Sequence, residues 1–202
     1  DGFGPEEANG QQISRRVWTR RLALAGRCEL LVPSRTLETI ARDIWGIPES
    51  RRHLVPNGIE LEKFAHAEPL PMPFGDGHTV IGTIGMLRAE KNISRLLRAF
   101  AAVQDPAARL LIVGDGPARA ELEAEAGRLG LGDRVAFLGH TDAPDRAQAC
   151  FDIFALSSDT EQMPYSVIEA MAAGLPVVAT DVGDVGMMLA QSVAEACTVA
   201  KE

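Results

Sequence analysis

The chain of 202 residues contains only three cysteines, Cys28, Cys150 and Cys197, and no two of them form a Cys-x-x-Cys pair. Their odd number and their positions in or beside apolar runs favour buried, reduced thiols over a disulfide framework or a metal site. Long apolar runs are also lacking, because no stretch approaches the ~20 residues that a membrane-spanning helix needs. We therefore expect a cytoplasmic protein, with at most peripheral contact to the cytoplasmic membrane face.

Basic residues are in deficit, since 20 lysines and arginines face 28 aspartates and glutamates, for a net charge of −8. A general nucleic-acid-binding protein needs a basic excess to neutralise phosphates, so we do not expect nucleic acid as a partner. The sequence contains no Asp-x-Asp and no cluster with metal-ligand spacing, so we expect no metal ion. It begins DGFGPEE, which is no signal peptide and lacks an initiator Met, and we expect a piece of a longer protein.

The first third of the chain has the pattern of helix, strand, helix and turn. Residues 11–27 carry five arginines beside an apolar side, which predicts a basic helix. A solvated basic face is the simpler interpretation of this helix, and contact with an anionic membrane surface or acceptor is the alternative. The run CELLVPS predicts a short buried strand, Ser34 the N-cap of the next helix, and Asn57-Gly58 a sharp turn.

Prolines and glycines between Leu61 and His78 predict a linker, and we place a domain boundary near residue 76. Beyond it the chain alternates apolar runs with helical patterns of roughly a dozen residues. The strand-like runs are HTVIGTIGML, RLLIVG, RVAFLG, FDIFALSS and LPVVAT, followed by a last helix near Met187 and a weak strand at ACTVA. Strands that are apolar throughout and separated by helices predict a doubly wound parallel sheet, that is, an α/β domain.

Ligands of such sheets bind outside the carboxyl ends of the strands, so the loops after strands are the places to search. After the first strand, Arg88 and Lys91 lie in a loop that leads into a helix, which suits a diphosphate. Two solvated surface cations are an equally good interpretation. After the second strand, VGDGPAR has Arg119 where a dinucleotide fingerprint needs its third glycine, so we interpret it as a tight turn with Pro117 beginning a helix.

Two glutamates lie eight residues apart in EQMPYSVIE. Pro164 is suited to the first turn of a helix, which places Glu161 in the loop before it and Glu169 on its second turn. This arrangement suits an extended ligand with hydroxyls at both ends and an anionic phosphate between them, facing the N–H groups from Met163 to Ser166. The alternative is that Glu161 only complements the helix dipole and Glu169 is exposed.

The stretch EQMPYSVIEAMAAGLPVVATDVGD resembles the E-x7-E signature of the family 4 glycosyltransferases. VPNGIE, IGTIGMLRAEKN, LLIVGDGP and VAFLG resemble the same family in the same order, so the resemblance covers residues 29–185. It implies the GT-B fold, with two Rossmann-like domains and a nucleotide-sugar donor bound by the second. Residues 1–76 would then be a remnant of the acceptor domain with the linker, and residues 77–202 a donor domain truncated at its end.

The resemblance also implies roles for single residues. Glu169 would bind the ribose hydroxyls, Glu161 the hydroxyls of the donor sugar, Lys91 with Arg88 the diphosphate, and the loop near His140 the base. The implied donor-binding set is Gly85, Met86, Arg88, Lys91, His140, Glu161, Met163, Pro164, Tyr165, Ser166 and Glu169, of which Lys91, Arg88 and Glu161 are the candidate catalytic residues. Three positions depart from the family pattern, with Met86 replacing arginine and Asn92 and Gln162 replacing glycine.

The implied reaction is retaining transfer of a sugar from a UDP- or GDP-sugar to a glycan, lipid-linked or small acceptor, as in polysaccharide biosynthesis. It implies no metal ion and no cofactor, since the nucleotide sugar is a substrate. Two alternatives stay open, a sugar-nucleotide epimerase or phosphorylase on the same fold and a non-catalytic nucleotide-binding module.

Overall fold

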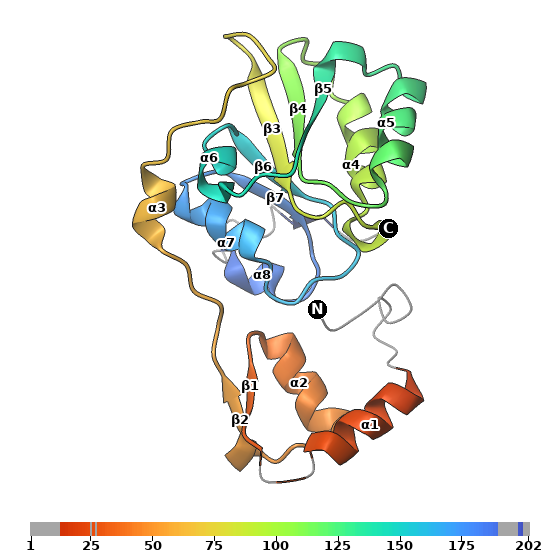
Figure 1. The fold of residues 1–202 in the computed structure, drawn as a ribbon, viewed down its shortest axis with the longest axis vertical. Coiled ribbons are helices and arrows are strands. Elements are labelled where there is room, and N and C mark those ends of the chain that lie inside the picture. The colour runs from red at the N-terminus through yellow and green to blue at the C-terminus, as the bar shows by residue number, and fades with distance from the viewer. Residues whose placement is uncertain (1–12, 25, 27, 190–197, 200–202) are drawn as a thin grey trace.

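The described part of the chain forms two parallel sheets (Figure 1). In this computed structural model the described residues are 13–24, 26, 28–189 and 198–199. The larger sheet has the order β5-β4-β3-β6-β7-β8, with each neighbouring pair parallel. Its strands are β3 (Thr79–Ile84), β4 (Ala108–Val113), β5 (Val135–Gly139), β6 (Ile153–Leu156), β7 (Val177–Thr180) and β8 (Thr198–Val199). Because the order reverses between β3 and β6, the sheet is doubly wound, which confirms the predicted fold class.

Both faces of this sheet are covered by helices (Figure 1). Leu110 and Ile112 of β4 face one hydrophobic cluster, while Leu111 and Val113 face the other, and all four side chains are fully buried. Burial on both faces explains why the strands have no polar alternation. One face is covered by α4 (Ile93–Ala101) and α5 (Arg119–Arg128), and the other by α6 (Pro144–Gln148), α7 (Tyr165–Ala172) and α8 (Val185–Met188).

Residues 13–54, which we call the N-terminal unit, contain the smaller sheet. Their elements are α1 (Ser14–Leu24), β1 (Leu30–Val32), α2 (Arg35–Asp43), a 3-10 turn at Glu49–Arg51 and β2 (Arg52–Leu54). The predicted N-cap is confirmed, since the hydroxyl of Ser34 accepts a hydrogen bond from the N–H of Leu37 at 3.1 Å. Ala41, Trp45 and Ile47 form a small core of their own, so the unit is packed.

One prediction for the connection between the two sheets was wrong, and one element of the connection was not predicted. No turn forms at Asn57-Gly58, where the chain has no regular secondary structure, and the side chain of Asn57 donates to the carbonyl of Met163 at 2.9 Å. The linker also contains a helix, α3 (Leu61–Ala65), whose Phe64 is buried. A helix of five residues has little stability of its own, so burial against α6 and α7 decides it, and no local pattern predicts that burial.

The loop after β4 is the predicted tight turn, although α5 begins at Arg119 and Pro117 lies in the turn before it. Gly114 has a positive φ of 133°, and a Cβ at this position would lie 1.8 Å from the carbonyl oxygen of Gly85. Only glycine lets the two loops approach this closely. The contact supports the loop after β3, where the predicted phosphate site lies. The domain boundary near residue 76 stays a prediction.

Candidate functional site

A cleft of about 1270 Å³ separates the N-terminal unit from the carboxyl ends of β3 and β6. Residues of α1 and α2 line one wall, and the loops after β3 and β6 with the first turns of α7 line the other. Every residue of the predicted donor-binding set except His140 lies on the second wall. The structure therefore gathers residues that are up to 84 positions apart in the sequence (Gly85 to Glu169) into one concave site.

Lys91 and Glu161 are in direct contact within the cleft. The Lys91 Nζ atom lies 2.5 Å from Oε1 of Glu161, and the two side chains are only 23% and 11% exposed. The hydroxyl of Ser158 donates a second hydrogen bond to the same oxygen, at 2.7 Å. The predicted phosphate ligand and the predicted sugar ligand thus form one charged pair, a contact that the sequence pattern did not predict.

The backbone at Asn92 places Lys91. Asn92 is the one non-glycine residue of the described ranges with a positive φ (43°), in the left-handed region that Asn tolerates better than most residues. Its side chain accepts from the N–H of Arg95 and so caps α4, and its amide contacts Asp159 at 3.2 Å. The replacement of the family's glycine by Asn92 therefore fits the left-handed backbone conformation and adds a helix cap.

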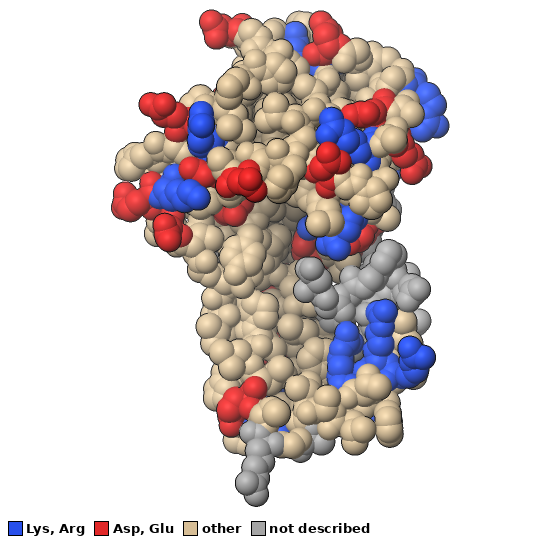
Figure 2. Space-filling model, viewed as in Figure 1, with Lys and Arg blue, Asp and Glu red and all other residues tan. Residues whose placement is uncertain are grey.

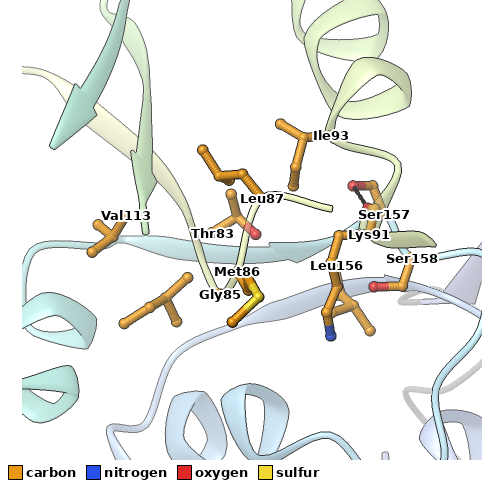
Figure 3. Close-up of a pocket in the computed structure, with 11 residues that line it drawn as sticks. Thr83, Gly85, Met86, Leu87, Lys91, Ile93, Val113, Leu156, Ser157 and Ser158 are labelled. Carbon is orange, nitrogen blue, oxygen red and sulfur yellow. Dashed lines mark hydrogen bonds between the residues drawn. The ribbon is translucent and has the colours of Figure 1, made fainter. Parts of the chain in front are cut away.

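Lys91 also borders a small pocket beneath the loop after β3. This pocket, with a volume of about 10 Å³, lies against the carboxyl ends of β3 and β6 (Figure 3). The hydroxyl of Ser157 donates to the carbonyl of Lys91 at 3.0 Å, which ties the two loops together. Met86 borders the same pocket and is 56% exposed, so an apolar side chain stands where the family has arginine.

Arg88 lines the cleft two residues beyond Met86. Its Nε lies 3.0 Å from Oε1 of Glu90, without the alignment of a hydrogen bond. Glu90 is 13% exposed on its side chain and Arg88 37%, so the pair lies at the edge of the cleft. The structure brings Arg88 and Lys91 to the same wall, each beside a carboxylate.

Glu169 lies on the second turn of α7, as predicted, and is half-buried. Burial raises the pKa of its carboxyl above the usual range, and a hydrogen bond from the side chain of Gln148 opposes this shift. Gln148 is fully buried, and its amide also donates to the carbonyl of Ser166 at 3.1 Å. The sequence analysis missed Gln148, because a single glutamine in a short helix carries no signal of what it faces.

The N-terminus of α7 opens into the cleft. Pro164 takes the N-cap position without a side-chain capping bond, and no hydrogen bond among the described residues engages the N–H groups of Tyr165 and Ser166. Helix N-termini of this kind carry a partial positive charge and favour anions. Gln162, on the same loop, has a negative φ and approaches Ser34 of the N-terminal unit at 3.5 Å, so its replacement of glycine causes no backbone strain.

Other predicted features lie elsewhere. His140 is 74% exposed and contacts Asp142 at 3.0 Å, outside the cleft lining, so the structure does not bring its side chain to the other predicted ligands. Cys150 is buried and burial raises the pKa of its thiol, but Cys28 is exposed, contrary to prediction, because it lies outside the small core of the N-terminal unit. Cys197 lies outside the described residues.

The basic residues of α1 lie together on the face of the N-terminal unit drawn in Figure 2. Trp18 and Leu22 on the same helix are each more than 60% exposed. No helix in the described ranges is long and apolar enough to span a membrane. The described residues also contain no group of three or more His, Cys, Asp or Glu side chains placed to hold a metal ion.

Comparison with known proteins links this geometry to one family. The family model described as "Glycosyl transferases group 1" matches residues 78–202. A GDP-mannose-dependent alpha-mannosyltransferase of Mycobacterium tuberculosis is 33% identical over 173 residues, which cover 83% of this chain and 42% of that protein. A 2-deoxystreptamine glucosyltransferase of Streptomyces kanamyceticus is 32% identical over 160 residues, 74% of this chain and 41% of that protein. The chain thus spans less than half the length of these curated relatives.

Solved structures agree with the fold. The crystal structure of Anabaena HepE in complex with UDP-glucose matches with a TM-score of 0.74 at 25% identity, over 94% of this chain and 54% of that chain. Sucrose-phosphate synthase from Thermosynechococcus elongatus matches with a TM-score of 0.76 at 25% identity, over 93% and 49%.

Proposed function

Because the chain belongs to the group 1 glycosyl transferases, we propose that it forms the donor-binding part of an enzyme that transfers a sugar from a nucleotide sugar to an acceptor hydroxyl. The observation that carries this proposal is the cleft wall on which Lys91, Glu161, Glu169 and the N-terminus of α7 lie together. In this proposal Glu161 binds the sugar hydroxyls, Lys91 and the N-terminus of α7 bind the diphosphate, and Glu169 binds the ribose. Residues 1–76 would contribute the acceptor side and residues 77–202 the donor side.

In the proposed reaction the bond between the anomeric carbon and the β-phosphate oxygen breaks, and the acceptor oxygen binds that carbon with retention of configuration. Negative charge builds on the departing β-phosphate. Lys91, Arg88 and the N–H groups of Tyr165 and Ser166 would stabilise this charge, and fixed donors of this kind are each worth about 3 kcal/mol in the transition state. The acceptor proton would pass to the departing phosphate, so the proposal needs neither a metal ion nor a separate base.

The donor substrate in this proposal is a UDP- or GDP-sugar. The solved complex of HepE contains UDP-glucose, and the mycobacterial relative is named for GDP-mannose. A glycan or lipid-linked acceptor fits the names of relatives such as the alpha-monoglucosyldiacylglycerol synthase of Streptococcus pneumoniae. For a lipid-linked acceptor, α1 with its arginines and exposed Trp18 would contact the cytoplasmic membrane face.

Calorimetry of this chain with UDP, GDP, UDP-glucose and GDP-mannose, with and without a chelator, tests the proposal. We expect one of the two nucleotide series to bind in the micromolar range without added metal. Binding of none of the four ligands would contradict the proposed donor site. Binding that chelator abolishes would contradict the metal-free mechanism alone.

A further inference from the structure

Asp184 connects the two sides of the cleft. It stands at the N-cap position of α8, but its carboxylate makes no capping bond to that helix. Instead it accepts hydrogen bonds from the first turn of α2, from the N–H of Arg35 at 2.6 Å and from the N–H and hydroxyl of Thr36 at 2.9 and 2.7 Å. Asp184 is only 6% exposed. An aspartate at an N-cap ordinarily serves its own helix, so this one is used between the two units.

The N-terminus of α2 depends on this carboxylate. A helix leaves its first four N–H groups without partners inside the helix. In α2 the first intrahelical bond is the one that the N–H of Glu38 donates to the carbonyl of Ser34. The hydroxyl of Ser34 accepts from the N–H of Leu37, and Asp184 accepts from the N–H groups of Arg35 and Thr36, so all three donors of the first helical turn have partners. Asp184 also adds a negative charge at the positive end of the helix dipole.

The backbone around Asp184 supports the loop that carries Glu161. The N–H of Asp184 donates to the carbonyl of Gln162 at 2.8 Å. The preceding Gly183 has a φ of 58°, and a Cβ there would lie 2.5 Å from the carbonyl oxygen of Glu161. The same loop accepts a second hydrogen bond, which the side-chain amide of Asn57 donates to the carbonyl of Met163 at 2.9 Å. Asp184 therefore holds α2 through its side chain and the Glu161 loop through its main chain.

We propose that Asp184 is a positioning residue that sets the width of the cleft by holding the N-terminal unit against the Glu161 loop. Without the carboxylate, two N–H groups of α2 have only water as a partner, and the arrangement in which the N-terminal unit has swung away from the loop becomes favoured. The main-chain bond from residue 184 to Gln162 stays in place, but the Glu161 loop loses its contact with Ser34 of the N-terminal unit, which helps to orient Glu161 toward a bound sugar. Only this last consequence rests on the proposed function, because the width of the cleft is a property of the protein alone.

Small-angle X-ray scattering of the unliganded chain tests the width directly. We expect Asp184→Ala and Asp184→Asn to increase the radius of gyration relative to the parent. Thr36→Val removes one of the three bonds and should produce a smaller increase in the same direction. Asp181→Asn is the matched control, because Asp181 is an exposed carboxylate on the same loop. Unchanged scattering from folded Asp184→Ala would overturn the proposal, and if that variant fails to fold, Asp184→Asn and Thr36→Val decide in the same way.

Calorimetry with UDP and UDP-glucose tests the link to the Glu161 loop. We expect Asp184→Asn to weaken UDP-glucose roughly tenfold, the effect of losing one hydrogen bond to a charged group, and to change UDP affinity less than about twofold. A role in fold stability alone would weaken both ligands equally, and that result would overturn the positioning role. If the parent binds neither ligand, the proposed function fails, while the scattering still decides whether Asp184 sets the arrangement of the two units.

Discussion

Lys91 and Glu161, 70 residues apart in the sequence, form a 2.5 Å ion pair on the wall of the cleft. In the proposed donor complex Lys91 binds the diphosphate and Glu161 binds the sugar. The pair therefore holds both side chains in place before the donor arrives, which reduces the conformational entropy lost on binding. It also means that a bound phosphate competes with Glu161 for the same ammonium group.

Replacement of Glu161 tests this competition. Glu161→Gln keeps the shape of the side chain but removes its charge, so sugar-nucleotide binding should weaken by ~1.5 to 3 kcal/mol, the worth of a hydrogen bond to a charged group. UDP affinity should not fall, because Lys91 is no longer shared with a carboxylate. Calorimetry of UDP and UDP-glucose measures both, with exposed Glu121→Gln as the control. Unchanged affinity for UDP-glucose would remove Glu161 from the sugar site.

The cations of the same wall should act on phosphate alone. Lys91→Ala should weaken UDP far more than uridine, because an ammonium group recognises the diphosphate and not the base or ribose. Arg88→Ala should cause a loss of similar size if Arg88 replaces the charge that is missing at Met86. The binding of both ligands to each variant provides the measurement, and Arg98→Ala, a cation 57% exposed on α4, provides the control. Equal losses for uridine and UDP would contradict the assignment.

Glu169 should make stability depend on pH. Burial raises its pKa in the folded state, so its contribution is most favourable at low pH, where the carboxyl is protonated, and is lost as the pH rises through that raised pKa. Glu169→Gln should therefore match the parent in melting temperature near pH 4 and exceed it near pH 7. The difference between the two melting curves from pH 4 to pH 8 isolates this group from the other carboxyls. A difference that does not change with pH would contradict the buried-charge account.

The same substitution should weaken ligand binding at pH 7. If Glu169 accepts the ribose hydroxyls, Glu169→Gln weakens uridine, UDP and UDP-glucose by similar factors, unlike Glu161→Gln. A gain in stability with a loss of affinity is the expected pattern when a buried charge is kept for binding. Full retention of uridine affinity would exclude the ribose role.

Asn92 allows a test of the backbone before α4. Asn92→Gly keeps the left-handed conformation at little cost but loses the side-chain cap, which costs a few tenths of a kcal/mol. Asn92→Ala loses the cap and adds left-handed strain, for a combined cost of ~2 to 3 kcal/mol. Urea denaturation of both variants measures the difference. Equal stabilities would contradict the conformational explanation of this departure from the family pattern.

Local sequence patterns were sufficient to predict several features of the fold and of the site. The apolar run Leu110–Val113 is a strand buried on both faces, because polar groups are absent from both of its sides. Ser34 caps α2 as predicted, since a cap needs only residues within one turn. Pro164 directly precedes α7, so Glu161 lies in the loop before the helix and Glu169 lies within it. This prediction also needed only the residues around the start of the helix.

Contacts between units and between strand ends depended on tertiary structure. The pairing of Lys91 with Glu161 requires β3 and β6 to be neighbouring strands. The local sequence of neither strand determines that strand order. The burial of Gln148 beside Glu169 and the hydrogen bonds from α2 to Asp184 likewise join segments that no local periodicity relates. Hydrophobic patterning specifies which faces are buried, whereas polar partners across a cleft depend on the packing of whole elements, so the cleft's charged contacts became visible only in three dimensions.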